Sequence, residues 1–169
     1  MPVTVLLVLL LNRAALRATH APTPTPSAPS PATKAVLPPV RVPAPPASAG
    51  ASRYCPALLA AVPLTLTDLQ SRPVQSGSPF VAAWGEPPVL LRCGVARPRG
   101  FVVGVQTIVV NGVAWYPEPQ GNLTVWTAVD RPVYVEVSVP AGYASAPVAA
   151  LSTAVGRTLS AEPIRPGGG

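Results

Sequence analysis

The clearest pattern in the chain is an alternation of valines with other residues between 133 and 139. Valine occupies every second position of this run, and Tyr134, Glu136 and Ser138 lie between the valines. Successive side chains of a strand point to opposite faces, so this period of two predicts a β-strand with one buried and one solvated face. Such a strand is typical of an antiparallel sheet.

Further runs rich in β-forming residues precede this strand. They are Val89–Cys93, Val102–Val110, Val113–Tyr116 and Leu123–Val129. Asn111-Gly112 separates two of them and predicts a hairpin with a type I′ turn, because both central residues of that turn need positive φ. We therefore expect a small antiparallel sheet of four to five strands.

Two helices are expected beside the sheet. Pro56 suits the first turn of a short helix that runs to Ala61 and is ended by Pro63. A C-terminal helix is predicted between Ser145, a plausible N-cap, and Leu159. One stripe of this helix is apolar: Val148, Leu151, Val155 and Leu159. It can cover the valine face of the sheet, so the predicted fold class is α+β, with a short N-terminal helix and a C-terminal helix on one face.

The N-terminal 20 residues are predicted to be an apolar leader, either a signal or a clipped membrane anchor. The apolar run Val3–Leu11 is far shorter than the roughly 20 residues that a spanning helix needs, and it fits the core of a signal peptide. Arg13 and Arg17 follow the run, whereas export favours positive charge before it. An ordinary apolar N-terminus is the alternative.

The remaining boundaries follow from composition. Residues 21–52 carry many of the 25 prolines and show neither a helical nor a strand period, so we expect a disordered Pro/Ala-rich linker with polyproline II character. Residues 53–162 form the expected folded domain, and residues 163–169 a flexible tail.

The net charge of +6 does not indicate nucleic-acid binding. From Arg53 onward eight arginines oppose six acids, a net charge of +2, and the rest of the excess lies in the leader and linker. Arg92, Arg97 and Arg99 form one local basic cluster, which is more often a solvated loop than a phosphate site. No recognition helix or phosphate-binding loop accompanies it, so no nucleic-acid partner is expected.

Cys55 and Cys93 are the only cysteines of the chain. Their separation does not match the close spacing of redox-active pairs, and the apolar alternation places Cys93 on the buried side of its strand. A structural disulfide that ties the first helix to the first strand is the favoured interpretation. Such bridges persist in oxidising compartments, so the pair indicates an extracytoplasmic location.

Candidate catalytic chemistry is sparse. The single histidine, His20, lies outside the predicted domain, so neither a Ser-His nor a Cys-His pair can be built there. We expect no metal and no cofactor. Glu86 and Asp130, near Trp84 and Trp126, are the best pair for the alternative hypothesis of a small carboxylate-dependent hydrolase acting on glycan.

Aromatic residues offer a possible ligand-binding surface. Trp84, Tyr116, Trp126 and Tyr134 are the candidates for such a surface, where they would stack on a sugar or peptide. The favoured interpretation is instead that the tryptophans fill the core and Tyr134 is a half-exposed strand residue.

An ordered series of short motifs carries a family resemblance. It comprises Cys55-Pro56-Ala57-Leu58, Arg72-Pro73-Val74, Ala82-Ala83-Trp84-Gly85, Pro87-Pro88, Leu91-Arg92-Cys93-Gly94, Val110-Asn111-Gly112-Val113-x-Trp115 and Thr127-Ala128-Val129-Asp130-Arg131. From about residue 53 to 160 the chain resembles an actinobacterial domain of unknown function, number three-five-one-five, with mycobacterial members. The resemblance implies an N-terminal membrane segment followed by an extracytoplasmic domain, and it brings no catalytic residues.

Together these features predict a cell-envelope protein, membrane-anchored or secreted, that acts as a non-enzymatic binding or accessory module. The expected partners are the membrane, through the N-terminus, and an envelope protein or glycan.

Overall fold

The computed structural model describes residues 37–46 and 48–168. The predicted leader and the linker as far as residue 36 lie outside these residues. No helix within the described ranges has the length and apolar character needed to cross a membrane.

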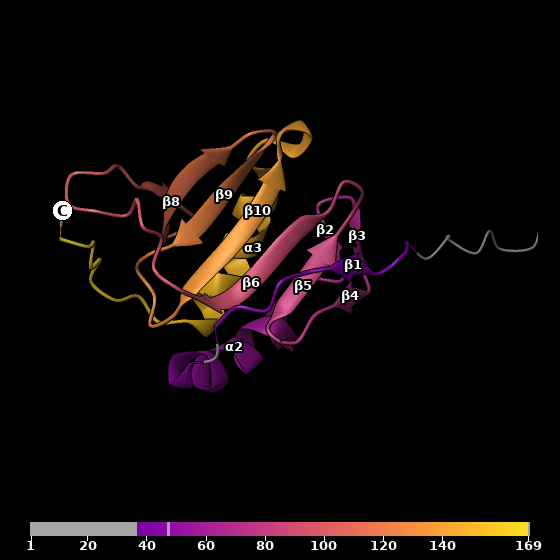
Figure 1. The fold of residues 1–169 in the computed structure, drawn as a ribbon, viewed down its shortest axis with the longest axis horizontal. Helices are drawn as coiled ribbons and strands as arrows, with labels where there is room; N and C mark the ends of the chain where they lie inside the picture. Colours follow the sequence, from indigo (N-terminus) through magenta and orange to yellow (C-terminus); the bar gives the residue numbers. More distant parts are fainter. Residues whose placement is uncertain (1–36, 47, 169) are drawn as a thin grey trace, which may run out of the picture. The chain divides into compact units, whose positions relative to one another are not determined.

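Eight strands form one antiparallel sheet in the order β2-β3-β5-β6-β10-β9-β8-β7 (Figure 1). Their bounds are Thr65–Leu66 (β2), Leu69–Arg72 (β3), Val81–Trp84 (β5), Val89–Val95 (β6), Ile108–Val110 (β7), Val113–Gln120 (β8), Leu123–Ala128 (β9) and Tyr134–Pro140 (β10). Val40–Arg41 (β1) and Val74–Gln75 (β4) form a separate parallel pair. The fold is α+β as predicted, but the expected four to five strands are too few. The additional strands have only two to four residues, too short for a period of two to be visible.

Helix α3 (Ala146–Thr158) covers the valine face of the sheet, and Figure 1 shows it behind the central strands. Each apolar residue predicted for its stripe is buried, as are Val135, Val137 and Val139 of β10. The Trp115 indole N–H donates to Ser152 Oγ at 2.9 Å and joins β8 to the helix. Ser145 precedes the helix as expected, although its side chain forms no capping hydrogen bond.

Helix α2 (Ala49–Ala61) begins earlier than predicted. Ser48 caps it, since its Oγ accepts from the Ala51 N–H at 3.0 Å. Pro56 lies inside the helix instead of in its first turn. The proline is on the exposed side of the helix, so the Ser52 carbonyl that it leaves without a donor faces water.

The predicted disulfide is confirmed. Cys55 of α2 and Cys93 of β6 are bonded, with their Cα atoms 5.7 Å apart, and both residues are fully buried. The bridge thus fixes α2 to a central strand of the sheet instead of the first strand. Gly94 follows with φ +85°, and a Cβ there would lie 2.5 Å from the Ala51 Cβ. A glycine at this position lets the helix pack directly on the strand.

The predicted hairpin is also present, between β7 and β8. Asn111 and Gly112 both have positive φ, 48° and 76°. The strand before the turn is shorter than expected, because it begins at Ile108 and the preceding residues form a loop.

Two segments lie on the sheet face opposite α3, here called the second face. The first, residues 37–46, is named the strap. Arg72 shares the second face with Ala83 by strand register, and its Nη2 donates to the Pro38 carbonyl at 2.7 Å. Ala83 is 2% exposed although no helix covers this face, and Figure 1 shows the strap crossing in front of β5 and β6. The strap therefore belongs to the folded unit, which already includes residue 37, so the boundary expected at Arg53 is corrected.

The second segment is the loop of residues 96–107, named the Phe101 loop. Phe101 is 1% exposed and packs with Ala114 and Val129. The C-terminal tail joins the loop, because the Gly167 N–H donates to the Phe101 carbonyl at 2.9 Å. Contrary to the expectation of a flexible tail after Glu162, the chain is therefore held in place as far as Gly167.

Candidate binding groove

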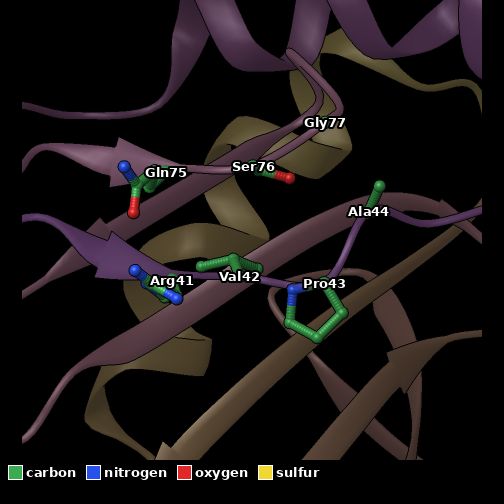
Figure 2. A pocket seen from close by; sticks show the side chains of 7 residues that line it. All are labelled: Arg41, Val42, Pro43, Ala44, Gln75, Ser76 and Gly77. Carbon is green, nitrogen blue, oxygen red and sulfur yellow. The ribbon is translucent and has the colours of Figure 1, made fainter.

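An open groove of about 670 Å³ lies between the strap and residues 75–77, at the end of β4 (Figure 2). Its lining comes from these two segments alone: Arg41, Val42, Pro43, Ala44, Gln75, Ser76 and Gly77. The groove is open to solvent over most of its surface, so a ligand would lie along it without being enclosed. It is larger than a groove of about 490 Å³ at the end of α2 and one of about 180 Å³ beside Ser48.

Strand pairing builds the groove. The N–H groups of Val40 and Val42 donate to the carbonyls of Pro73 and Gln75, at 2.9 and 3.0 Å. In an extended chain the intervening residue, Arg41, turns its own backbone groups away from β4. The prolines of the strap do not interrupt this short pairing, because none occupies a position whose backbone N–H donates to β4.

Polar and apolar groups are separated along the groove. Figure 2 shows the side chains of Arg41 and Gln75 beside each other at one end, Val42 between the two segments, and Ala44 near Gly77 at the other end. Val42 is 4% exposed and forms an apolar floor. Arg41 is exposed and forms no ion pair with any described residue. The guanidinium, amide and hydroxyl groups can donate hydrogen bonds to oxygen acceptors of a ligand.

A buried arginine holds the strap in position. Arg72 donates from Nη1 to the Gly85 carbonyl at 2.8 Å and from Nη2 to Pro38, and it pairs with Glu86. Its side chain is only 4% exposed. The planar guanidinium thus joins the β5–β6 turn to the start of the strap, which is a geometry that a lysine could not reproduce.

The four aromatic candidates for a ligand surface do not lie on one face. By register Trp84 faces the same side as Val89, and Trp126 the same side as Val137, which is the side covered by α3. Trp84 is 1% exposed, and its indole N–H donates to the Pro63 carbonyl at 2.8 Å. Trp126 packs half-buried against the same core. The tryptophans are therefore core residues.

The two tyrosines lie on the second face, beneath the Phe101 loop. Tyr116 and Tyr134 pack against the small cluster around Phe101, whose ring centroid is 5.5 Å from that of Tyr116. Burial and, secondarily, the Glu118 carboxylate raise the pKa of Tyr116. Both tyrosines are half-buried and contribute to the small core of this face.

The second face also carries a cross-strand ion pair at its centre. Arg92 Nη2 contacts the two carboxylate oxygens of Glu136 at 2.6 and 2.7 Å, and Arg92 Nε adds a bond of 2.9 Å. The predicted basic cluster is thereby divided, since Arg92 is paired on the sheet whereas Arg97 and Arg99 are exposed in the Phe101 loop.

The two carboxylates considered for glycan hydrolysis lie at opposite ends of the sheet. Glu86 precedes β6, whose first residues lie beside the end of β10, whereas Asp130 precedes the start of β10. The strand residues between these ends span roughly 16 Å, while glycosidase carboxylates are about 5 to 9.5 Å apart. Glu86 instead pairs with Arg72, and Asp130 pairs with Arg131 at 2.9 Å.

Sequence reasoning missed the groove because the strap was assigned to the disordered linker. One signal was present: Val40 and Val42 alternate with Arg41 inside the Pro-rich tract, a weak period of two. Gln75 and Ser76 carry no such signal. Among residues 37–46 and 48–168, no three His, Cys, Asp or Glu side chains are grouped as a metal site would require.

Comparison with known proteins confirms that the chain carries a domain of unknown function. No curated protein and no solved structure matches the chain. A family model described as "Protein of unknown function (DUF3515)" matches residues 1–164, and the chain therefore belongs to the DUF3515 family.

Proposed function

We propose that this protein is an extracytoplasmic, non-enzymatic binding module of the cell envelope, and that the strap groove is its ligand site. The Cys55–Cys93 disulfide carries the first part of the proposal. Disulfides persist in oxidising compartments and are rare in the cytosol. A bridge between two fully buried cysteines at the centre of a fold is a structural feature of the domain.

The chemistry of the groove supports a ligand that carries carboxylates. Arg41 supplies an exposed positive charge, and Gln75 and Ser76 lie on the facing segment as neutral hydrogen-bonding groups. A guanidinium binds a carboxylate with two parallel hydrogen bonds. The apolar floor at Val42 suits the carbon skeleton of the same ligand. An acidic envelope glycan or a carboxylate-bearing peptide segment has this combination of groups.

Site-specific photo-crosslinking in intact cells tests the proposal. A photo-reactive residue at Ala44, in the groove, should give a defined adduct, and the same residue at Thr153, exposed on α3, should not. Arg41→Ala should lower the adduct yield roughly tenfold, as expected for loss of a charged hydrogen bond. Arg157→Ala, which removes an exposed arginine from α3, is the matched control and should leave the yield unchanged.

Two outcomes would contradict the proposal. Equal adducts from positions 44 and 153 would show that the groove has no preference for a ligand. If Arg41→Ala left the yield of the position 44 adduct unchanged, the Arg41 guanidinium would not take part in ligand binding.

A further inference from the structure

Exposed apolar side chains concentrate on the Phe101 loop, the β7 edge and the C-terminal tail. Among the described residues the large apolar side chains with the greatest exposure are Leu64 (80%), Val103 (73%), Val109 (69%), Ile108 (47%) and Ile164 (43%). All except Leu64 belong to these three segments. Val109 pairs with Ala114, which packs with Phe101, so the β7 edge adjoins the Phe101 loop. Exposed apolar residues on adjoining segments, unlike scattered ones, mark an interaction surface.

Backbone hydrogen bonds hold in place the two segments that carry Val103 and Ile164. The Val103 N–H donates to the Gly167 carbonyl at 3.2 Å, and the tail is tied at its other end by the Glu162 N–H, which donates to the Asp130 carbonyl at 2.8 Å. Ile164 lies between these two ties. Figure 1 shows the loop and the tail meeting beyond the strands, next to the C-terminus. Phe101, buried in its cluster, anchors the middle of the loop to the sheet.

Positive charge accompanies the apolar residues. Arg97 and Arg99 are exposed at the start of the Phe101 loop and form no ion pair with described residues. Arg165 lies in the tail and pairs loosely with Glu162, at 3.9 Å. Glu118 lies beneath the loop, beside Gly100. The two unpaired arginines carry more positive charge than this single carboxylate neutralises, so the surface keeps a net positive charge.

We propose that Val103, Val109 and Ile164, with Arg97 and Arg99, form a docking surface for an anionic phospholipid bilayer. Apolar side chains that enter the interface and arginines that meet lipid phosphates are the two contributions on which peripheral membrane binding depends. A symmetric pairing with a second copy fits less well, because it would place two sets of unpaired arginines near each other. The three-residue edge strand β7 also offers little backbone for such pairing.

Hydrogen exchange of the full chain with vesicles tests this surface independently of any membrane contact made by the N-terminal residues. Vesicles of phosphatidylcholine mixed with phosphatidylglycerol should slow amide exchange in residues 101–109, and vesicles of phosphatidylcholine alone should slow it far less. Val103→Asp should abolish the protection. Leu64→Asp, which changes an equally exposed apolar residue at the other edge of the sheet, should retain it.

The charged contribution has its own matched pair of variants. Arg97→Gln with Arg99→Gln should weaken the vesicle-dependent protection roughly tenfold or more, since each surface arginine contributes to anionic-lipid binding. Arg53→Gln with Arg157→Gln removes the same charge from the two helices and should have little effect.

Three results would overturn the inference: no protection of residues 101–109 on either vesicle, equal protection on both, or protection that rises with protein concentration in the absence of lipid. The last would identify a second copy as the partner. Because these readouts do not involve the strap groove, they are independent of the proposed ligand site.

Discussion

Buried arginines attach outer segments of this domain to its sheet. Arg72 bonds to the strap and to the β5–β6 turn, and Arg131 donates from Nη2 to the Gly112 carbonyl in the β7–β8 turn at 2.8 Å. In both cases one guanidinium donates hydrogen bonds to two backbone carbonyls that are far apart in the sequence. These contacts position exposed segments that have few apolar anchors of their own.

Replacement of Arg72 should release the strap while leaving the sheet folded. Arg72→Met keeps much of the side-chain volume but removes the bonds to Pro38 and Gly85, which should cost about 2 kcal/mol. We expect the amides of Val40 and Val42 to exchange with solvent roughly tenfold faster or more in this variant. Arg157→Met, at an exposed position, is the control. Unchanged exchange at Val40 and Val42 would mean that the strap is held by other contacts.

The ionisation of Tyr116 should lower the stability of the domain at alkaline pH. Burial and Glu118 raise its pKa in the folded state, so folding favours the protonated hydroxyl. This contribution is complete below the ordinary tyrosine pKa of about 10 and is lost as the pH rises through the folded-state pKa. The free energy of unfolding should therefore fall more steeply above about pH 10 in the native protein than in Tyr116→Phe. Parallel curves from urea unfolding would contradict this role.

At the scale of elements, the junction of α2 with β6 organises the core. The disulfide, Gly94 and the buried side chains of Ala51 and Leu58 all lie where the helix meets the strand. The helix approaches so closely that no side chain fits between Gly94 and Ala51. Correct packing of α2 on the sheet thus depends on one residue without a Cβ.

Gly94→Ala should destabilise the domain strongly. The added Cβ would meet Ala51 at 2.5 Å, and φ of +85° is unfavourable for alanine. We expect a loss of roughly 2 to 4 kcal/mol in chemical denaturation, from overpacking and backbone strain together. Gly142→Ala, where a Cβ would meet nothing within 4 Å, should change stability little. Similar effects of the two substitutions would refute the close packing.

The predictable elements were those with a strong local signal. The alternating valines of β10, the Asn111-Gly112 turn and the apolar stripe of α3 are each specified by a few adjacent residues. The strap, the short strands β2 to β5 and the groove depend on tertiary contacts, such as the bond from Arg72 to Pro38. For Trp84 and Trp126 the sequence leaves core and surface both open, because composition alone does not say which face a tryptophan takes.

In the described part of the chain, the eight-stranded sheet has two unequal cores on its two faces. Helix α3 and the disulfide-linked α2 cover one face with the large core, whereas the strap and the Phe101 loop partly cover the other. The strap groove and the apolar, basic loop both belong to these coverings of the second face. The large core provides stability, and the segments outside it provide the surfaces that we assign to binding.

The disulfide should contribute much of this stability. Closing a loop between cysteines 38 residues apart is worth about 4 kcal/mol in the chain-entropy account. Cys55→Ala with Cys93→Ala should therefore lower the free energy of unfolding by about that amount and the thermal midpoint with it. If the double variant were as stable as the native protein, the disulfide would not stabilise the fold, and it would be informative only about the compartment.

The redox state of these cysteines in the cell tests the assigned compartment most directly. Because both are fully buried, the thiols must be trapped by rapid acid quenching, followed by alkylation under denaturing conditions without reductant. Mass spectrometry of the full chain should then find Cys55 and Cys93 unmodified and linked to each other. Alkylation of both cysteines would show a reduced pair, and it would contradict the extracytoplasmic location on which the proposed function rests.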